Sequence, residues 1–325
     1  MIIVYASNDN YAQHLGVSMC SLFDRNQREK RIQVYILSMG IKKENKEKLQ
    51  AVAQQYQREV FFIEMEGLEG KIPFPVDTGR FDVSTLGRLF IGEVLPQKIK
   101  RMIYLDCDTV IAGSLRPMWR TRLEGNVAGG VQEPTIYREV KEDIGLNADM
   151  PYFNAGALII DLERWRREET GKRMMAFYEA RNGKLFANDQ DVINHVLRGK
   201  IKTIPPKYNF FPNYRYFTYK GLIKMSPSYR LVSKEEFQKA KCHPAVIHYM
   251  GDERPWKAGN LNHYRRAYEL YLAKTPWKGA KKDKGQEIYM LAYHAMDYVT
   301  WLCPPVRLLI SRAYIWHRKK EGKGI

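Results

Sequence analysis

The sequence predicts an α/β protein with a central, mostly parallel sheet flanked by helices and a basic helical appendage at its C-terminal end. Short apolar runs alternate with amphipathic stretches through the first two hundred residues, as in successive strand–helix units. With 325 residues, 45% of them hydrophobic, the chain can bury a large core. The composition changes after residue 277, so we expect a main domain over 1–277 and a helical tail over 278–325.

The elements follow one another in a regular order. Residues 2–6 form a short apolar run of the kind found in buried strands, and Tyr11, Leu15, Met19 and Leu22 then recur at helical spacing. The same patterns predict further strands at 32–37, 60–63, 101–105, 126–131, 152–160 and 246–249. They predict further helices at 43–57, 84–95, 162–181 and 189–197. Ligands collect at the carboxyl ends of parallel strands, so polar residues that follow these strands are candidates for a site.

Charge and cysteine usage narrow the class of protein. The formal charge of +17 favours polyanionic partners: nucleic acid, anionic lipid or phosphate-bearing substrates. The four cysteines are far apart and form no CxxC pair, which argues against a zinc site or a disulfide framework and for a reducing compartment. The N-terminus shows no secretory leader, and no apolar stretch is long enough to span a bilayer. We expect a cytoplasmic protein, peripheral at the inner face of the cell membrane.

The sharpest motif is MIYLDCDTVI, residues 102–111, in which a predicted strand runs into Asp106 and Asp108. Residues two apart on an extended backbone point the same way, and two converging carboxylates repel unless a cation lies between them. Mg²⁺ and Mn²⁺ are the natural cations for such a pair. A turn with two solvated aspartates is the simpler alternative. A phosphatase of the haloacid-dehalogenase type would also carry DxD after a strand, but its second acidic pair is matched poorly by Asp189 and Asp191.

A second motif, HYMGDERPWKAG at 248–259, places a histidine at the end of a short predicted strand. A histidine nitrogen that joins two aspartates favours Mn²⁺ over Mg²⁺ or Ca²⁺, although Mg²⁺ remains an alternative. Gly251 allows close approach of the backbone to a diphosphate, and Arg254 and Lys257 can neutralise its charge. Taken alone, His248 is more often a structural histidine than a metal ligand.

With these two motifs in place, the chain resembles the family-eight glycosyltransferases, retaining enzymes that include bacterial lipopolysaccharide glucosyl- and galactosyltransferases and glycogenin. The resemblance covers roughly residues 1–275. It is carried by six motifs in the family's order: YASNDNY, GRLFIGEVLP, YLDCDTV, YFNAGALIIDLERWR, NDQDVIN and HYMGDERPW.

The resemblance implies a GT-A fold and transfer of a hexose, glucose or galactose, from a UDP-sugar to a glycan or lipid-linked acceptor. It implies that Mn²⁺ is held by Asp106, Asp108 and His248. The catalytic residues are expected to be Gln190, beside the anomeric carbon, and Asp189. The donor-binding residues that it implies are Ala6, Asn8, Asn10, Tyr11, Arg88, Asp106, Cys107, Asn154, Ala155, Asp189, Gly251 and Arg254. Each of these has a simpler structural alternative, such as a helix start for Tyr11 or a solvated helix charge for Arg88.

Two positions depart from the family's pattern. Asn8 stands where the family usually has Asp, so uracil would be recognised through an amide. Arg254 stands in the place of the lysine of HxxGxxKPW, which keeps the charge but changes its geometry.

The tail carries ten Lys or Arg against four Asp or Glu, interleaved with tyrosines and tryptophans. This composition suits an anionic bilayer surface, with a packed helix pair as the alternative. We expect removal of residues 285–325 to abolish liposome binding and to spare UDP-sugar hydrolysis. Pro304 and Pro305 are expected to split the segment.

Nucleic-acid binding and a catalytically inactive, lectin-like scaffold are disfavoured as functions, because the full carboxylate–histidine set would serve no purpose in either.

Overall fold

The computed structural model describes residues 1–65, 67, 72, 74–77, 83–303 and 306. Seven strands form one sheet in the order β3-β2-β1-β4-β7-β6-β8, and β5 and β9 form a separate pair. The strands are β1 (Ile2–Asn8), β2 (Gln33–Met39), β3 (Glu59–Glu64), β4 (Arg101–Leu105), β5 (Thr109–Ile111), β6 (Ala128–Gln132), β7 (Phe153–Asp161), β8 (Ile201–Thr203) and β9 (Val246–His248).

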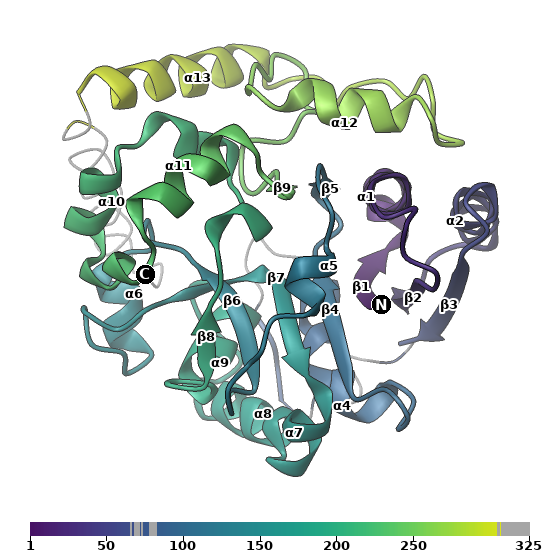
Figure 1. The fold of residues 1–325 in the computed structure, drawn as a ribbon, viewed down its shortest axis with the longest axis horizontal. Helices are drawn as coiled ribbons and strands as arrows, with labels where there is room; N and C mark the ends of the chain where they lie inside the picture. The colour runs from purple at the N-terminus through teal and green to yellow at the C-terminus, as the bar shows by residue number, and fades with distance from the viewer. Residues whose placement is uncertain (66, 68–71, 73, 78–82, 304–305, 307–325) are drawn as a thin grey trace.

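Helices cover both faces of the sheet, as Figure 1 shows. The longer α-helices are α1 (Ala12–Arg25), α2 (Lys43–Gln55), α8 (Thr170–Ala180), α9 (Asp189–Val196), α11 (Lys234–Cys242), α12 (Arg265–Leu272) and α13 (Glu287–Leu302). Shorter ones are α4 (Ile91–Val94), α5 (Arg116–Trp119), α6 (Arg138–Asp143), α7 (Leu162–Arg167) and α10 (Tyr219–Met225). The 3₁₀ helices are η1 (Asp9–Tyr11), η2 (Val83–Phe90), η3 (Pro206–Tyr208), η4 (Pro212–Tyr216) and η5 (Pro227–Leu231).

The direction of the strands decides where the site forms. The pairs β1–β2, β2–β3, β1–β4 and β6–β8 are parallel, whereas β7 is antiparallel to both β4 and β6. Strand β7 therefore starts at the edge where β1 and β4 end. At this edge, residues that follow β1 and β4 meet residues that open β7. The strand directions confirm the mostly parallel α/β sheet predicted from the sequence.

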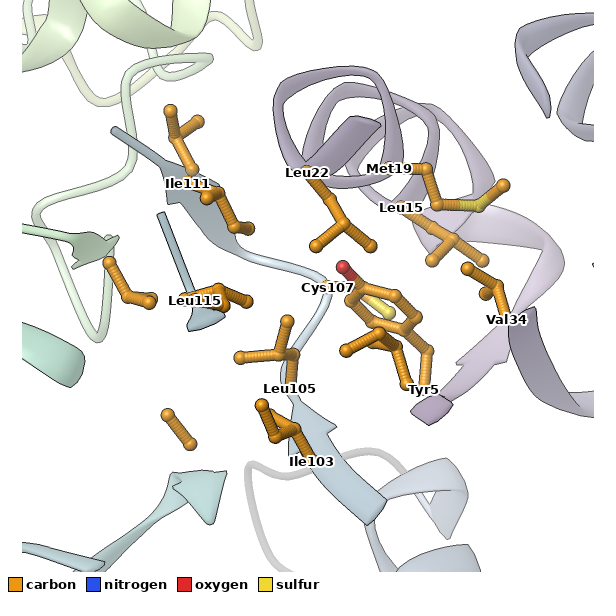
Figure 2. Packing of buried hydrophobic residues seen from close by; sticks show 14 of the residues in the cluster. Tyr5, Leu15, Met19, Leu22, Val34, Ile103, Leu105, Cys107, Ile111 and Leu115 are labelled. Carbon is orange, nitrogen blue, oxygen red and sulfur yellow. The ribbon is translucent and has the colours of Figure 1, made fainter. Parts of the chain in front are cut away.

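The core has a layer on each side of the sheet, because successive side chains of a strand point to opposite faces. Along β1, Ile3 and Tyr5 belong to the layer under α1, whereas Val4 and Ala6 belong to the layer under α7, α8 and α9. Figure 2 shows the first layer, where Leu15, Met19 and Leu22 of α1 surround Tyr5 and Cys107. Full burial of each large apolar side chain stabilises the fold by about 1.5–3 kcal/mol.

Two helices differ from their predicted extent. The stretch 84–95 is mostly the 3₁₀ helix η2 followed by the single turn α4. The stretch 162–181 is two helices, because Glu169 takes a left-handed conformation (φ 48°) between α7 and α8. Such a φ is uncommon for a residue with a Cβ and ends the first helix.

The described part of the tail is α13, which lies beside α12 along the top of Figure 1. The predicted break at Pro304 and Pro305 lies outside the described residues. Among the described residues, no helix combines the length and apolar character needed to cross a bilayer.

Candidate active site

Two short strands bring the DxD motif and the distant histidine together. Asp106 follows β4, and its backbone N–H donates to the carbonyl of Gly156 over 2.8 Å. Strand β5 then pairs with β9 so that Thr109 lies opposite His248. As a result Nε2 of His248 is 3.1 Å from Oδ1 of Asp108 and 3.8 Å from Oδ2 of Asp106. One ligand atom from each of the three residues lies within 4.8 Å of the others, a spacing that one divalent ion with bonds of about 2.1 Å can bridge.

A chain of hydrogen bonds fixes the ring of His248. The backbone N–H of Gly156 and Nδ2 of Asn209 both donate to Oδ1 of Asn154, over 2.9 and 2.8 Å. Oδ1 of Asn209 therefore faces His248 and accepts from Nδ1 over 2.8 Å. With the proton on Nδ1, the Nε2 lone pair is available to a metal beside the two aspartates. The donor set thus suits a divalent cation.

The electrostatics of this pair point the same way. Burial alone would lower the pKa of His248, but the carboxylates of Asp108, Asp106 and Glu133 together outweigh that effect and raise the pKa above its ordinary value. Burial would raise the pKa of Asp108, and the imidazole of His248 lowers it below its ordinary value. Both directions favour an imidazolium–carboxylate pair, and a divalent ion bound between these side chains would displace the proton on Nε2.

Arg88 links the DxD motif to the NDQDVIN motif. Its guanidinium donates to Oδ1 of Asp106 over 2.8 Å and to the carbonyl of Ala155 over 2.9 Å, and its Nε is 2.9 Å from Oδ2 of Asp189. The guanidinium is buried and lies over the ring of Tyr104. Burial lowers its pKa, yet the two carboxylates more than offset this, so Arg88 stays charged. Burial raises the pKa of Asp189 to about 6, against the opposing effect of Arg88.

Gln190 is held by four hydrogen bonds. Its Oε1 accepts from Nδ2 of Asn154 over 2.9 Å and from the N–H of Ala155 over 3.0 Å. Its Nε2 donates to Oε2 of Glu133 and to the hydroxyl of Tyr152, each over 3.1 Å. Glu133 is buried, and this burial raises its pKa despite the hydrogen bonds from Asn154 and Gln190. The carboxamide of Gln190 therefore has one fixed orientation.

The residues expected to hold a nucleoside lie at the end of β1. Asn8 accepts a hydrogen bond from the backbone N–H of Tyr11 and so caps η1, while Asn10 is exposed beside it. The ring of Tyr11 is half-buried at the start of α1. The thiol of Cys107 points into the core and donates to the carbonyl of Ala6 over 3.2 Å, so only the backbone of Cys107 is left to meet a ligand.

The loop after β9 carries the expected phosphate-binding residues. Gly251 has a φ of 64°, a conformation that L side chains rarely adopt, and space is open where its Cβ would be. The guanidinium of Arg254 lies 5.9 Å from the ring centre of Tyr11. Within the described part of the chain, its buried Nε has no hydrogen-bond partner. Arg254 thus lies beside Tyr11, the expected nucleoside-binding ring, and its Nε is available to donate to an anion.

Four residues of this site were not predicted as site residues. Gly156 belongs to the YFNAGALIIDLERWR motif, of which only Asn154 and Ala155 were expected in the site, and Asn209 lies in an aromatic stretch without helix or strand periodicity. Glu133 follows β6 and belongs to no motif, whereas Tyr152 precedes β7 as the first residue of the YFNAGALIIDLERWR motif. The signal available in the sequence was their position at strand ends, on the edge where β4 ends and β7 begins.

The arrangement is matched by a known family. The sequence model described as Glycosyl transferase family 8 covers residues 2–259. The chain belongs to glycosyltransferase family 8. It is therefore a glycosyltransferase, and the phosphatase and nucleic-acid alternatives are not favoured.

Several relatives resemble this family 8 glycosyltransferase over most of their length. General stress protein A of Bacillus subtilis is 27% identical over 280 residues, which are 85% of this chain and 94% of that protein. Lipopolysaccharide 1,2-glucosyltransferase of Escherichia coli K12 is 25% identical over 280 residues, 85% of this chain and 78% of that protein. The solved structure of the galactosyltransferase LgtC with donor and acceptor sugar analogs is 26% identical, with a TM-score of 0.71, over 85% of this chain and 96% of that one. The likeness to LgtC supports the GT-A fold.

Proposed function

We propose that this glycosyltransferase moves a hexose, glucose or galactose, from a UDP-sugar to a glycan or lipid-linked acceptor of the lipopolysaccharide type, with Mn²⁺ bound by Asp106, Asp108 and His248. The observation that carries the proposal is the convergence of these three side chains with the Nε2 lone pair of His248 between the carboxylates. The lipopolysaccharide glucosyltransferase of E. coli and the galactosyltransferase LgtC among its relatives support the substrate class.

The charges of the site fit departure of a diphosphate. When bound, Mn²⁺ would supply a Lewis acid for the negative charge that grows on UDP as the glycosidic C–O bond breaks. The positive charge of Arg254 acts on Asp108, and its guanidinium can donate to the same phosphates. Arg88 pairs with both Asp106 and Asp189 and so fixes the two carboxylates relative to each other.

The orientation of Gln190 supports retention by attack on the leaving-group face. Both lone-pair directions of its Oε1 already accept hydrogen bonds, from Asn154 and from the backbone of Ala155. A covalent sugar on Oε1 would displace at least one of these hydrogen bonds. We therefore propose that the acceptor oxygen bonds to the anomeric carbon as the phosphate oxygen departs, and that the departing phosphate takes the acceptor's proton. A covalent sugar trapped on Gln190 or Asp189 would overturn this step.

The polarity of α13 supports a peripheral membrane attachment. Its buried positions include His294, Asp297 and Thr300, whereas its exposed positions are largely apolar: Ile288, Leu291, Tyr298, Val299, Trp301 and Leu302. A surface helix normally has the opposite arrangement. The neighbouring exposed stretch 278–284 carries four lysines, which suit anionic head groups beside an apolar face. We propose that α13 lies on an anionic bilayer at the cytoplasmic face.

One assay tests the donor and the metal together. Purified protein is incubated with UDP-glucose or UDP-galactose, and release of UDP is followed with Mn²⁺, with Mg²⁺ and with a chelator. We expect hydrolysis of one UDP-hexose that Mn²⁺ stimulates and the chelator removes. Asp108→Asn should lower this hydrolysis by at least about 100-fold, since it removes one charged ligand. Equal UDP release with and without metal, or by the variant, would contradict the proposal.

A further inference from the structure

Helix α13 touches the candidate active site through two tyrosines, the partly buried Tyr293 and Tyr289, which is 52% exposed. The hydroxyl of Tyr289 donates to Oδ2 of Asp252 over 2.8 Å, and the hydroxyl of Tyr293 donates to Oε1 of Glu253 over 3.1 Å. Asp252 and Glu253 stand between Gly251 and Arg254, the two residues proposed to meet the diphosphate. Figure 1 shows α13 crossing the same side of the molecule as β9, from which this loop starts.

The contact is tightly packed. Ligand-type atoms of Glu253, His294 and Asp297 all lie within 4.8 Å of one another, and all three side chains are buried. A Cβ added to Gly259 would come within 3.0 Å of the backbone of Glu287, so the start of α13 and the end of the loop meet without a gap. Helix α13 therefore packs directly against the loop after β9.

The loop is also held from its opposite side. Nδ2 of Asn260 donates to the carbonyl of Asp252 over 2.9 Å, and Nδ2 of Asn262 donates to the carbonyl of Glu253. Lys257 pairs with Oδ1 of Asp252 over 2.8 Å. These bonds hold the two backbone carbonyls and Oδ1 of Asp252. The tyrosines of α13 hold Oδ2 of Asp252 and Oε1 of Glu253, and so add to the restraints on Gly251 and Arg254.

We infer that Tyr289 and Tyr293 of α13 are positioning residues for the diphosphate-binding loop, so that affinity for the sugar donor depends on the C-terminal helix. The inference rests on the proposed donor site and names how that site is held. It departs from the sequence-based expectation that residues 285–325 can be removed without loss of donor hydrolysis. Because the tyrosines contact the loop and not the reacting atoms, their loss should weaken donor binding more than turnover.

The test compares Tyr289→Phe/Tyr293→Phe with Tyr298→Phe, a hydroxyl deletion at an exposed position of the same helix. In the ligand-free protein, we expect the double variant to lose hydrogen-exchange protection over residues 250–257 and to keep it in α1. With a UDP-hexose, we expect KM to rise on the order of 5–10-fold while kcat changes less than about twofold. The control should match the wild type in both measurements.

The two readouts separate this inference from the proposed function. Hydrogen exchange needs no donor, so a loosened loop in the double variant supports the positioning role even where no UDP-sugar is consumed. Where the wild type does hydrolyse a UDP-sugar, unchanged exchange together with unchanged KM in the double variant overturns the inference and leaves the proposed function standing. A fall in kcat with unchanged KM overturns it as well, because it would place the tyrosines in the chemical step.

Discussion

Gly156 lies directly against His248: a methyl group added at Gly156 would be 2.3 Å from Cε1 of His248 and 2.7 Å from Oδ2 of Asp106. Real Cβ atoms do not approach this closely, so Gly156→Ala must displace the two metal-ligand candidates it touches. We expect the substitution to lower Mn²⁺ affinity at least about tenfold, as for other disturbances next to a ligand. Titration of free Mn²⁺ against the variant measures the loss.

Gly221→Ala is the matched control for this substitution. The added Cβ at Gly221 meets only the hydroxyl of Thr218 at 3.0 Å, and alanine is favoured inside a helix such as α10. We expect this control to bind Mn²⁺ as the wild type does. Wild-type Mn²⁺ affinity in Gly156→Ala would show that the three side chains do not hold the ion.

Removal of the Asn209 side chain tests the orientation of the His248 ring. Without its carbonyl oxygen, Nδ1 of His248 loses its acceptor, and the ring is free to rotate or to change tautomer. We expect Asn209→Ala to weaken Mn²⁺ binding about 10–100-fold and to cost about 1–3 kcal/mol of unfolding free energy. Asn213→Ala is the control, since Oδ1 of Asn213 has no hydrogen-bond partner within the described residues. Equal Mn²⁺ affinities in the two variants would argue against the positioning role of Asn209.

The metal-ligand candidates could be predicted from the sequence because each belongs to a motif with its own chemistry. Asp106 and Asp108 follow an apolar strand, and His248 ends another, so each was a candidate by its place at a strand end. Their convergence comes from the antiparallel pairing of β5 with β9, outside the main sheet. The sheet could also be predicted, because its strands are short continuous apolar runs, which are typical of strands buried on both faces. The reversed direction of β7 has no such local signal, because an antiparallel strand buried on both faces looks like a parallel one.

The side chains that hold the site were harder to predict. Asn209 lies in a stretch without periodicity, and its role depends on pairing of Phe210 with Ile247 at the side of β9. Glu133 depends on a register shift between β6 and β7. The contact of α13 with the loop after β9 comes from tertiary packing between segments that sequence patterns treat as separate. Local patterns report burial and chemistry, whereas these contacts depend on the relative placement of distant elements.

Asp191 makes the stability depend on pH. It accepts hydrogen bonds from Tyr152 and from the backbone N–H of Ala187, but burial dominates and raises its pKa to about 7. The folded protein therefore keeps this proton up to about pH 7, whereas the unfolded chain loses it near pH 4. Stability from Asp191 is thus fully present below pH 4 and is lost as pH rises to 7, by up to about 1.4 kcal/mol per pH unit. Urea unfolding at several pH values measures this slope.

Asp191→Asn separates the effect of Asp191 from that of the other carboxyl groups with a raised pKa, Asp189 and Glu133. An asparagine can accept from Ala187 through its oxygen and donate to Tyr152 through its nitrogen, so it imitates the protonated acid. We expect the variant to be close to the wild type at pH 4, to be more stable than it at pH 8, and to show a smaller fall in unfolding free energy between these values. An identical pH slope in the variant would assign the dependence to the other two groups.

Helix α13 contributes to both the proposed membrane surface and the diphosphate-binding loop. If its exposed apolar side chains bind an anionic bilayer while Tyr289 and Tyr293 hold the loop, the bilayer and the donor stabilise the same placement of the helix. Linkage then requires each to strengthen the other by the same factor, typically 5-fold or more. We expect vesicles of phosphatidylglycerol and phosphatidylcholine to lower the Kd for UDP with Mn²⁺, and UDP with Mn²⁺ to lower the vesicle Kd equally. Leu291→Ser/Trp301→Ser, at two exposed apolar positions, should abolish the vesicle effect and keep the affinity for UDP in solution. Vesicle binding by the wild type with no change in its affinity for UDP would show that these two sets of side chains of α13 act independently.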